Sequence, residues 1–366
     1  MRPTADRGFS GRVNGRAAQL DGLRAVAMLA ICWDHWRPQS WTRMFPFEVF
    51  LFFFLVMTGY LITGSLLRER DRKEALGRPW RREALRVYQI RRGLRILAPY
   101  YAALALALLL SADVRQALGW YVFHLSNIHM AFLGDWPDGT NHFWSLSMQQ
   151  QFYLVWPFVI WFVPRKRLLP VMLAFTAVGP ATRWFHDDLS AWCAWPQVLT
   201  PAAFDYFGIG GLFALAVHRG MSLESPGLRW IAGFSCAAWL GLFAAHSAGR
   251  AVTGLWPFQQ TFLAIAACGV VAAAIVGLPG PAGHLLTRPA LQRIGQLSYG
   301  VYLFHNLAPL LAGKLFWFLW GPAFQSVFWD LFRVVLFAAV TWLLTLASWH
   351  WIETPLQDVR ARFSPR

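Results

Sequence analysis

The sequence contains little charge for its length. Only 14% of its 366 residues are Asp, Glu, Lys or Arg, whereas soluble domains usually carry about 25%. Hydrophobic residues make up 57% of the chain, and the mean hydropathy is +0.39. This composition excludes a cytosolic enzyme and a disordered tail, and it predicts a membrane protein that crosses the bilayer several times.

Cysteine is scarce as well. The four cysteines lie in apolar segments, at spacings that match neither a metal site nor a disulfide framework, so we expect small core residues. This excludes a secreted disulfide scaffold. The first twenty residues are rich in Arg and Gly and lack an apolar stretch, so we expect no cleavable signal peptide.

Charged segments divide the rest of the chain into apolar spans, several of them near the ~20 residues that cross a bilayer. We expect helices, because a backbone in lipid must satisfy its own polar groups and these segments are too long for barrel strands. The predicted spans are residues 20–36, 47–67, 94–111, 143–163, 168–183, 199–217, 230–245, 258–278, 297–318 and 334–351. A shorter segment, residues 120–132, is expected to be re-entrant or interfacial. The predicted fold class is therefore all-α, a polytopic membrane protein with about ten transmembrane helices.

The basic residues predict the orientation. An even number of spans places both termini on one side. If that side is the cytoplasm, 26 of the 33 Lys and Arg residues fall inside and 7 outside, as the positive-inside rule requires. We therefore expect a basic cytoplasmic tail at 1–19, a transmembrane domain at 20–355 and a second basic cytoplasmic tail at 356–366. The net charge of +15 then follows from topology and does not call for a nucleic-acid partner.

The first span carries Arg24 near its start and His35 near its end. Eleven residues advance a helix by about 1100°, so both side chains project from one face, about 16 Å apart along the axis. Histidine is the natural general base near neutral pH. Asp34 lies about 100° around the helix, so we expect another helix to supply the group that orients the His35 ring. The simpler alternative is a buried polar group that locks two helices.

Other polar side chains interrupt the apolar spans. Arg91 and Arg95 share a helix face at the mouth of the third span, where they could bind phosphates or lipid head groups. The run 149–151 is Gln-Gln-Gln, which predicts a polar cavity wall or interhelical hydrogen bonds. Ser298, Tyr302 and His305 fall on one helix face. Further ionisable residues in or beside the spans are Glu48, Asp205 and Glu353.

In this order, these segments resemble the acyltransferase-3 family of integral membrane acyltransferases. The resemblance covers nearly all of residues 20–356. It rests on Arg-x10-His at Arg24 and His35, on Arg-Arg-x-x-Arg-Ile from Arg91, on Thr-Gly-Tyr-Leu-Ile from Thr58, on Ser-Tyr-x-x-Tyr-Leu-x-His from Ser298, and on Ile-Glu-x-Pro from Ile352. It implies a ten-helix enzyme that moves an acyl group, mostly acetyl, from cytoplasmic acyl-CoA to a sugar hydroxyl.

The resemblance also implies roles for particular residues. His35 would be the catalytic residue. The substrate-binding residues would be Arg24, Arg91, Arg92, Arg95, Gln149, Gln150, His305 and Glu353. No metal or bound cofactor is expected; acyl-CoA, most simply acetyl-CoA, would be the donor substrate. The other partners would be the bilayer, here a bacterial cytoplasmic membrane, and an acceptor such as an exopolysaccharide, a lipid-linked glycan or a glycosylated metabolite.

The sequence departs from the family pattern at two places. The family has glutamates where this chain has Gln149 and Gln150, and glutamine cannot take up a proton. An acid early in the second helix falls on Phe52, and Glu48, one turn earlier, is the acid that could replace it. Two alternatives therefore stay open: the chain is a catalytically degenerate member of the family, or it is a transporter or flippase. His35 could act as a general base or carry the acyl group covalently.

Overall fold

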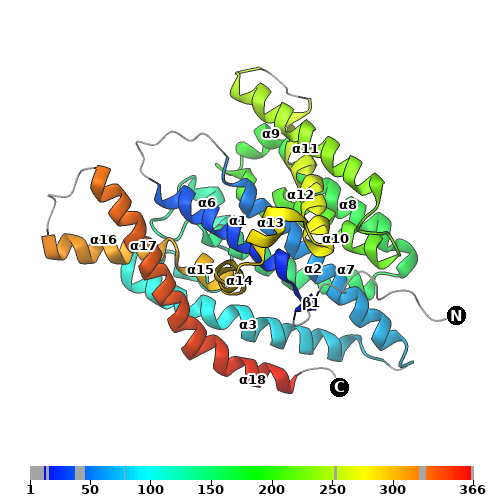
Figure 1. Ribbon diagram of the computed structural model, residues 1–366, viewed down its shortest axis with the longest axis horizontal. Helices are drawn as coiled ribbons and strands as arrows, with labels where there is room; N and C mark the ends of the chain where they lie inside the picture. Colours follow the sequence, from blue (N-terminus) through cyan, green and yellow to red (C-terminus); the bar gives the residue numbers. More distant parts are fainter. Residues whose placement is uncertain are drawn as a thin grey trace.

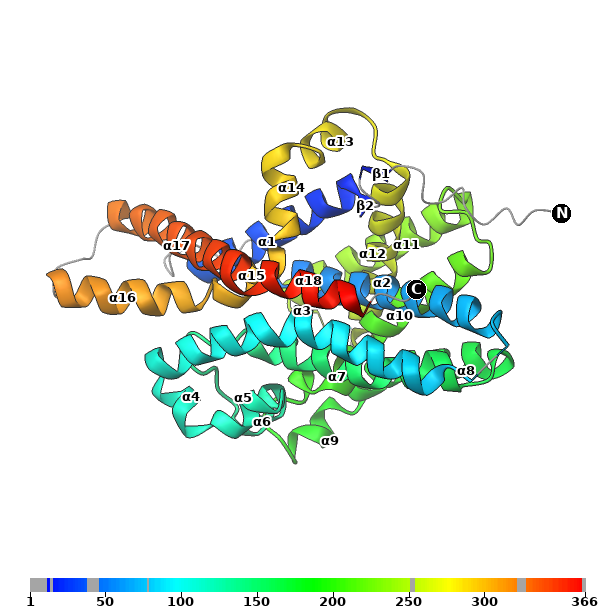
Figure 2. The ribbon, with the colours of Figure 1, turned by 90° about the horizontal axis from the view of Figure 1, so that it is seen from below.

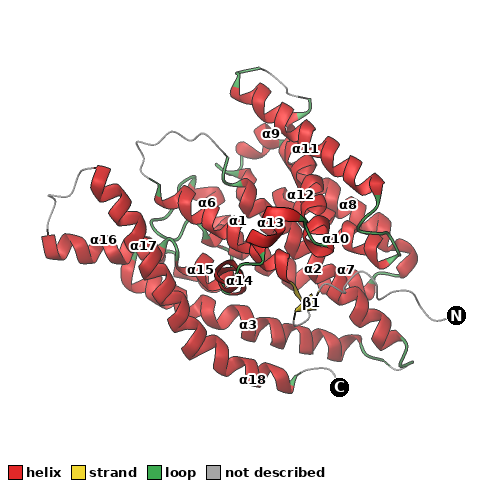
Figure 3. Cartoon of the chain, viewed as in Figure 1, coloured by secondary structure: helices red, strands yellow, loops and turns green. Residues whose placement is uncertain are grey.

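The computed structural model describes residues 12–13, 16–37, 46–77, 79–250, 254–320 and 327–363. These residues are helices and loops, apart from one antiparallel ladder of strands β1 (Arg12–Val13) and β2 (Arg16–Ala17) (Figure 3). The predicted all-α fold class is confirmed. The predicted tail 1–19 lies mostly outside the described residues, and so do the last three residues of the tail 356–366.

Long helices make up most of the chain (Figure 1). They are α1 (Ala18–Trp36), α2 (Val49–Glu74), α3 (Arg81–Leu110), α7 (Phe143–Phe162), α8 (Arg165–Trp184), α10 (Phe204–His218), α11 (Pro226–Ser247), α12 (Gln259–Val276), α16 (Leu307–Trp320) and α17 (Val327–Ser348). The shorter helices are α4 (Ala112–Gln116), α5 (Leu118–Val122), α6 (Ser126–Leu133), α9 (His186–Ser190), α13 (Gly280–Leu286), α14 (Pro289–Gln296), α15 (Ser298–Phe304) and α18 (Thr354–Arg362). A π-helical turn, η5 (Trp349–Glu353), joins α17 to α18. The 3₁₀ turns η2 (Pro196–Val198), η3 (Thr200–Ala203) and η4 (Trp256–Phe258) precede α10 and α12.

Six described helical segments are long and apolar enough to cross a membrane, which identifies a multi-pass membrane protein. They are Val49–Glu74, Arg81–Leu110, Thr200–His218, Pro226–Ser247, Trp256–Val276 and Leu331–Arg360. Within the described residues α1 and α7 fall outside this set, because α1 carries three charged side chains and α7 carries the three glutamines. The total of about ten spans and the cytoplasmic location of both termini stay predictions.

The ninth predicted span, residues 297–318, is not a single helix. Helix α15 ends at Phe304, and α16 begins at Leu307. Pro309 has no N–H to donate to the carbonyl of His305 four residues earlier, so a continuous helix would lose this bond. The indole of Trp36 donates to that carbonyl instead, at 2.8 Å. The prediction of one continuous helix was wrong, and the break places His305 between two helices.

Helices α2 and α10 pack closely because glycines lie at their contact. A Cβ on Gly59 would lie 2.2 Å from the carbonyl oxygen of Phe207, and one on Gly210 would lie 2.1 Å from that of Val56. Any larger residue would push the two backbones apart. Small residues are the usual way in which membrane helices approach this closely.

The charged ends of α2, α8 and α10 meet at one end of the molecule. Arg165, at the start of α8, forms ion pairs with Glu74 and Asp71 at the end of α2. His218, at the end of α10, lies 3.0 Å from Asp71. Helix α18 runs beside α3 in both ribbon views (Figures 1 and 2). These segments therefore share one side, and that this side faces the cytoplasm stays a prediction.

Candidate active site

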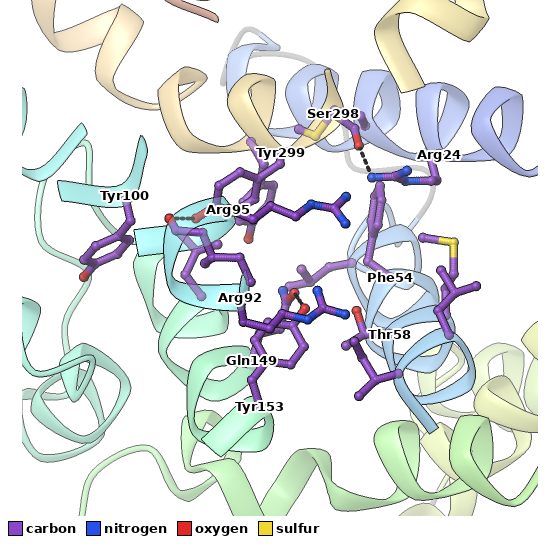
Figure 4. Close-up of a pocket in the computed structure, with 18 of the residues that line it drawn as sticks. Arg24, Phe54, Thr58, Arg92, Arg95, Tyr100, Gln149, Tyr153, Ser298 and Tyr299 are labelled. Carbon is purple, nitrogen blue, oxygen red and sulfur yellow. Dashed lines mark hydrogen bonds between the residues drawn. The ribbon is translucent and has the colours of Figure 1, made fainter. Parts of the chain in front are cut away.

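A cavity of about 210 Å³ lies between α1, α2, α3, α7 and α15. Arg24 of α1 and Arg92 and Arg95 of α3 line it, and Figure 4 shows their guanidinium groups directed into the same space. None of the described residues that line this cavity is acidic. Three converging guanidinium groups in such a space suit an anionic ligand.

A larger basic groove opens next to the cavity, with a volume of about 710 Å³. Its basic side chains come from three helices: Lys73 of α2, Arg91, Arg92 and Arg95 of α3, and Arg360 and Arg362 of α18. Arg92 and Arg95 line both spaces. From Glu83 in the groove to Tyr100 in the cavity, α3 advances about 26 Å. The groove and the cavity together can therefore hold an extended ligand with its charged part in the groove.

Neighbouring side chains fix the positions of the cavity arginines. Arg24 donates to the hydroxyl of Ser298 at 3.0 Å and pairs with Asp21 at 3.2 Å. The guanidinium of Arg92 lies 4.9 Å from the ring centroid of Tyr153, a cation–π contact. The Tyr153 hydroxyl in turn donates to the side-chain oxygen of Gln149, another lining residue, over 3.4 Å.

A pair of histidines lies at the other end of α1. Nδ1 of His35 is 2.7 Å from Nε2 of His305, and the rings are nearly parallel. Nδ1 of His305 is 2.7 Å from the carbonyl oxygen of Tyr302, which can only accept, so in the neutral ring that nitrogen carries the proton. Nε2 of His305 then accepts from Nδ1–H of His35, and the lone pair of His35 is on Nε2. This is the tautomer that a general base requires.

A third histidine supports the pair. Nε2 of His142 donates to the carbonyl of Leu303 at 3.1 Å, and its Nδ1 accepts from the amide of Asn306 at 3.3 Å. The His142 ring meets His305 edge-on, at 4.7 Å between centroids. His142 and His305 are buried, whereas His35 is exposed. The described residues contain no group of three or more His, Cys, Asp or Glu placed to hold a metal ion.

Tyr302 separates the histidines from the cavity. It lines the cavity, its ring lies 5.2 Å from that of His305, and its hydroxyl is 2.6 Å from that of Ser145. His35 and His305 do not line the cavity. The candidate site thus has two parts, a basic cavity with its groove and a histidine cluster, on either side of the contact between Tyr302 and Ser145.

Comparison with known proteins identifies the family. A model of the acyltransferase-3 family, described as an acyltransferase domain, matches residues 17–349. The chain belongs to this family. It is 24% identical to the peptidoglycan O-acetyltransferase OatA of Listeria monocytogenes over 92% of its own length and 55% of that relative. It is also 24% identical to nodulation protein 10 of Rhizobium leguminosarum, over 86% of this chain and 83% of the relative. The chain thus spans about half the length of the first relative, and no solved structure matches it.

Three further residues that the family resemblance assigns to substrate binding do not line the cavity. Arg91 lines only the groove. Glu353 lies in η5 and interacts electrostatically with Arg95 and Arg360. Gln150 is buried outside the cavity, and its side-chain oxygen has no hydrogen-bond partner among the described residues.

In this acyltransferase neither Phe52, at the family's acid position in the second helix, nor Glu48, its possible replacement, lies where a substrate-contacting acid would be expected. Phe52 stacks on Tyr206 at 4.5 Å between centroids. Glu48 is exposed and lines neither the cavity nor the groove. The hypothesis that Glu48 replaces the family acid next to the substrate therefore gains no support from its position.

Sequence reasoning missed several residues that the site contains. His142 lies in the polar segment that leads to Gln149 and Gln150, and Asn306 directly follows His305, so their positions offered a signal. His124 and Tyr100 line the cavity but belong to no motif. Asp205, a candidate because of its place in an apolar span, forms an ion pair with Arg183, and neither residue lines the cavity. The pair holds helices together, which is the alternative to a functional role.

Proposed function

We propose that this acyltransferase moves an acetyl or other short acyl group from cytoplasmic acyl-CoA to a hydroxyl of a sugar-containing acceptor, in a bacterial cytoplasmic membrane. The observation that supports the donor is the basic groove that continues past Arg92 and Arg95 into the cavity. Acyl-CoA is an extended molecule with its phosphates at one end and the thioester at the other. The groove suits the phosphates, and the narrower cavity suits the acyl end of the pantetheine arm.

The name of one relative supports the class of acceptor. OatA is named a peptidoglycan O-acetyltransferase, and peptidoglycan contains sugars. An exopolysaccharide, a lipid-linked glycan or a glycosylated metabolite would each present the hydroxyl that O-acylation needs. The chemistry at His35 is the same for all three.

The histidine cluster supports general-base catalysis. Nε2 of His35 takes the proton from the acceptor hydroxyl while the oxygen attacks the thioester carbonyl carbon. The C–O bond forms, the C–S bond breaks, and the proton passes from His35 to the departing CoA thiolate. His305 accepts the hydrogen bond from Nδ1–H of His35 throughout and holds the ring in its productive tautomer.

The contact between Tyr302 and Ser145 leaves two routes for the acyl group. In the first, this contact opens and the acceptor attacks the thioester directly. In the second, the contact also opens, the acyl group is first transferred to His35, and the acceptor then attacks this intermediate from the exposed side. We propose the direct route. Labelled acyl group trapped on the wild-type protein without acceptor, and absent from His35→Ala, would establish the covalent route instead.

Transfer from labelled acetyl-CoA by the purified protein in a bilayer tests the proposal. His35→Ala should lower the rate about 10²- to 10⁴-fold, the usual contribution of a positioned base. His284→Ala, which alters an exposed histidine of α13, is the matched control and should keep full activity. Equal rates in both variants would contradict the role of His35. Wild-type protein that binds acetyl-CoA but transfers nothing to glycan acceptors would instead indicate a degenerate member.

A further inference from the structure

His124 lies at the end of the cavity away from the groove. It connects α5 to α6, within the segment predicted to be re-entrant or interfacial, and it lines the cavity. Its ring lies 4.1 Å from that of Tyr100, between centroids. Tyr100 is eight residues beyond Arg92 on α3, about 12 Å along the axis. A ligand whose charged part binds at the arginines would therefore reach His124 with its opposite end.

The backbone of His124 has an uncommon conformation. Its φ is +55°, in the left-handed region, and no other described residue except glycines has a positive φ. Two hydrogen bonds hold it: the amide donates to the carbonyl of Tyr121 at 3.1 Å, and the carbonyl accepts from the side-chain amide of Gln151 at 2.8 Å. Gln151 also donates to Asn127 at 2.9 Å. Backbones held in such sparsely populated regions cluster at functional sites.

The side chain of His124 is buried but has no partner in the described part of the chain. It is 6% exposed, and neither ring nitrogen forms a hydrogen bond with a described residue. Burial lowers the pKa of this imidazole to about 4, so the ring is neutral near pH 7. A neutral imidazole offers one N–H donor and one acceptor nitrogen. Buried polar groups of this kind normally have a partner. Neither ring nitrogen has accessible surface in this structure, so a ligand in the cavity pairs with one of them only when the ring turns toward it.

We propose that His124 donates a hydrogen bond to the carbonyl oxygen of the acyl group of the bound donor. This inference rests on the proposed acyl-CoA donor. With the phosphates at the groove and the arginines, the acyl group is the part of the donor that reaches the end of the cavity. Met28, Leu51 and Leu146 supply apolar surface among the lining residues and suit the short acyl chain. His124 is therefore a substrate-binding residue that recognises the acyl carbonyl.

Two non-reactive analogues of acetyl-CoA separate this contact from the rest of the donor. In the first, a methylene group replaces the thioester sulfur, which leaves a ketone carbonyl at the same position. In the second, the same chain lacks the carbonyl oxygen. The wild-type protein should bind the ketone about three- to tenfold more tightly than the alkyl analogue, as expected for one net hydrogen bond.

Variants of His124 then identify the donor of that bond. His124→Phe keeps an aromatic ring against Tyr100 but removes the N–H, so it should bind the two analogues equally. His124→Asn tolerates a positive φ and keeps an N–H donor, so it should retain part of the preference for the ketone. His129→Phe is the matched control, since His129 stacks on Trp120 and does not line the cavity. It should keep the full preference.

A measurement on the wild-type protein covers the case in which His124→Phe fails to fold. The carbonyl stretching frequency of the bound, isotope-labelled ketone should be lower than in an apolar solvent, because a hydrogen bond weakens the C=O bond. An unshifted frequency, or an unchanged preference in His124→Phe, would overturn the role of His124 while leaving the donor intact. Failure of the wild-type protein to bind either analogue or CoA itself would instead overturn the proposed donor.

Discussion

Arg183 and the cavity arginines illustrate two uses of a guanidinium group among membrane helices. Arg183 of α8 is enclosed by protein acceptors: the carboxylate of Asp205, the carbonyls of Ala202 and Pro257, and the hydroxyl of Thr261. Arg92, by contrast, lies against the face of Tyr153 and lines both the cavity and the groove. The first arrangement ties α8 to α10 and α12, whereas the second directs positive charge into space that a ligand can enter. Charge in a membrane helix therefore indicates function only when its surroundings leave room for a ligand.

The largest expected effect follows from breaking the enclosed pair. Arg183→Gln leaves the Asp205 carboxylate buried without its cation, and removing one partner of a buried pair typically costs about 3–5 kcal/mol. We expect a large fall in the midpoint of thermal unfolding, and activity lost together with the fold. Replacing both residues by leucine should recover most of the loss, because no buried charge remains. An unfolding midpoint for Arg183→Gln equal to that of the wild type would show that this pair does not hold the helices.

The cavity arginines should respond in the opposite way. Arg95→Gln should raise the KM for acetyl-CoA about 10- to 100-fold, since a charge-assisted hydrogen bond to phosphate contributes about 1.5–3 kcal/mol. The unfolding midpoint should stay near that of the wild type, because Arg95 is exposed and Arg360 remains beside Glu353 in the variant. Arg72→Gln is the control, since Arg72 is an exposed residue of α2 that pairs with Glu69. A normal KM in Arg95→Gln would contradict donor binding in the cavity.

The smallest effect is expected at Gln149, where the family has a glutamate. Gln149→Glu adds a carboxylate to a cavity whose charged lining side chains are arginines. The new charge should compete with the anionic donor and raise the KM for acetyl-CoA about two- to fivefold, the size of a partly solvated ion pair, with kcat unchanged. A tenfold rise in kcat would instead show that the family carboxylate takes part in the chemistry and that this chain is a slow member.

The sequence predicted the helical fold and the polar face of α1 because both depend on local periodicity. Charged segments marked the helix ends to within a few residues for most spans, although α2 and α3 extend further into their charged ends. His305, which directly follows α15, contacts His35, as the expectation of an orienting group from another segment requires; that it orients the ring stays a prediction. Ser298, Tyr302 and His305, predicted to share a face, contact Arg24, Ser145 and His35 in turn.

Features that depend on contacts between distant segments were not predicted. Pro309 is a residue type that breaks helices, and it leaves the carbonyl of His305 without its helical hydrogen bond. The sequence does not show that Trp36 of another helix donates to this carbonyl instead. The left-handed backbone of His124 depends on Gln151, whose side chain reaches it from α7. Nor does periodicity show that Tyr302 lies between the cavity and the histidines. The roles assigned to the site residues therefore stay predictions, although their positions are now known.

The contacts of α1 also have a consequence for biogenesis. Ribosomes make the chain from its N-terminus, so α1 emerges long before α15, which carries Ser298 and is followed directly by His305. The contacts of Arg24 with Ser298 and of His35 with His305 span 274 and 270 residues. During most of synthesis, α1 must therefore stay beside the translocon or in the bilayer without these two partners. Translation products that stop before α15 should be recognised as incomplete and removed by membrane proteases faster than the full chain.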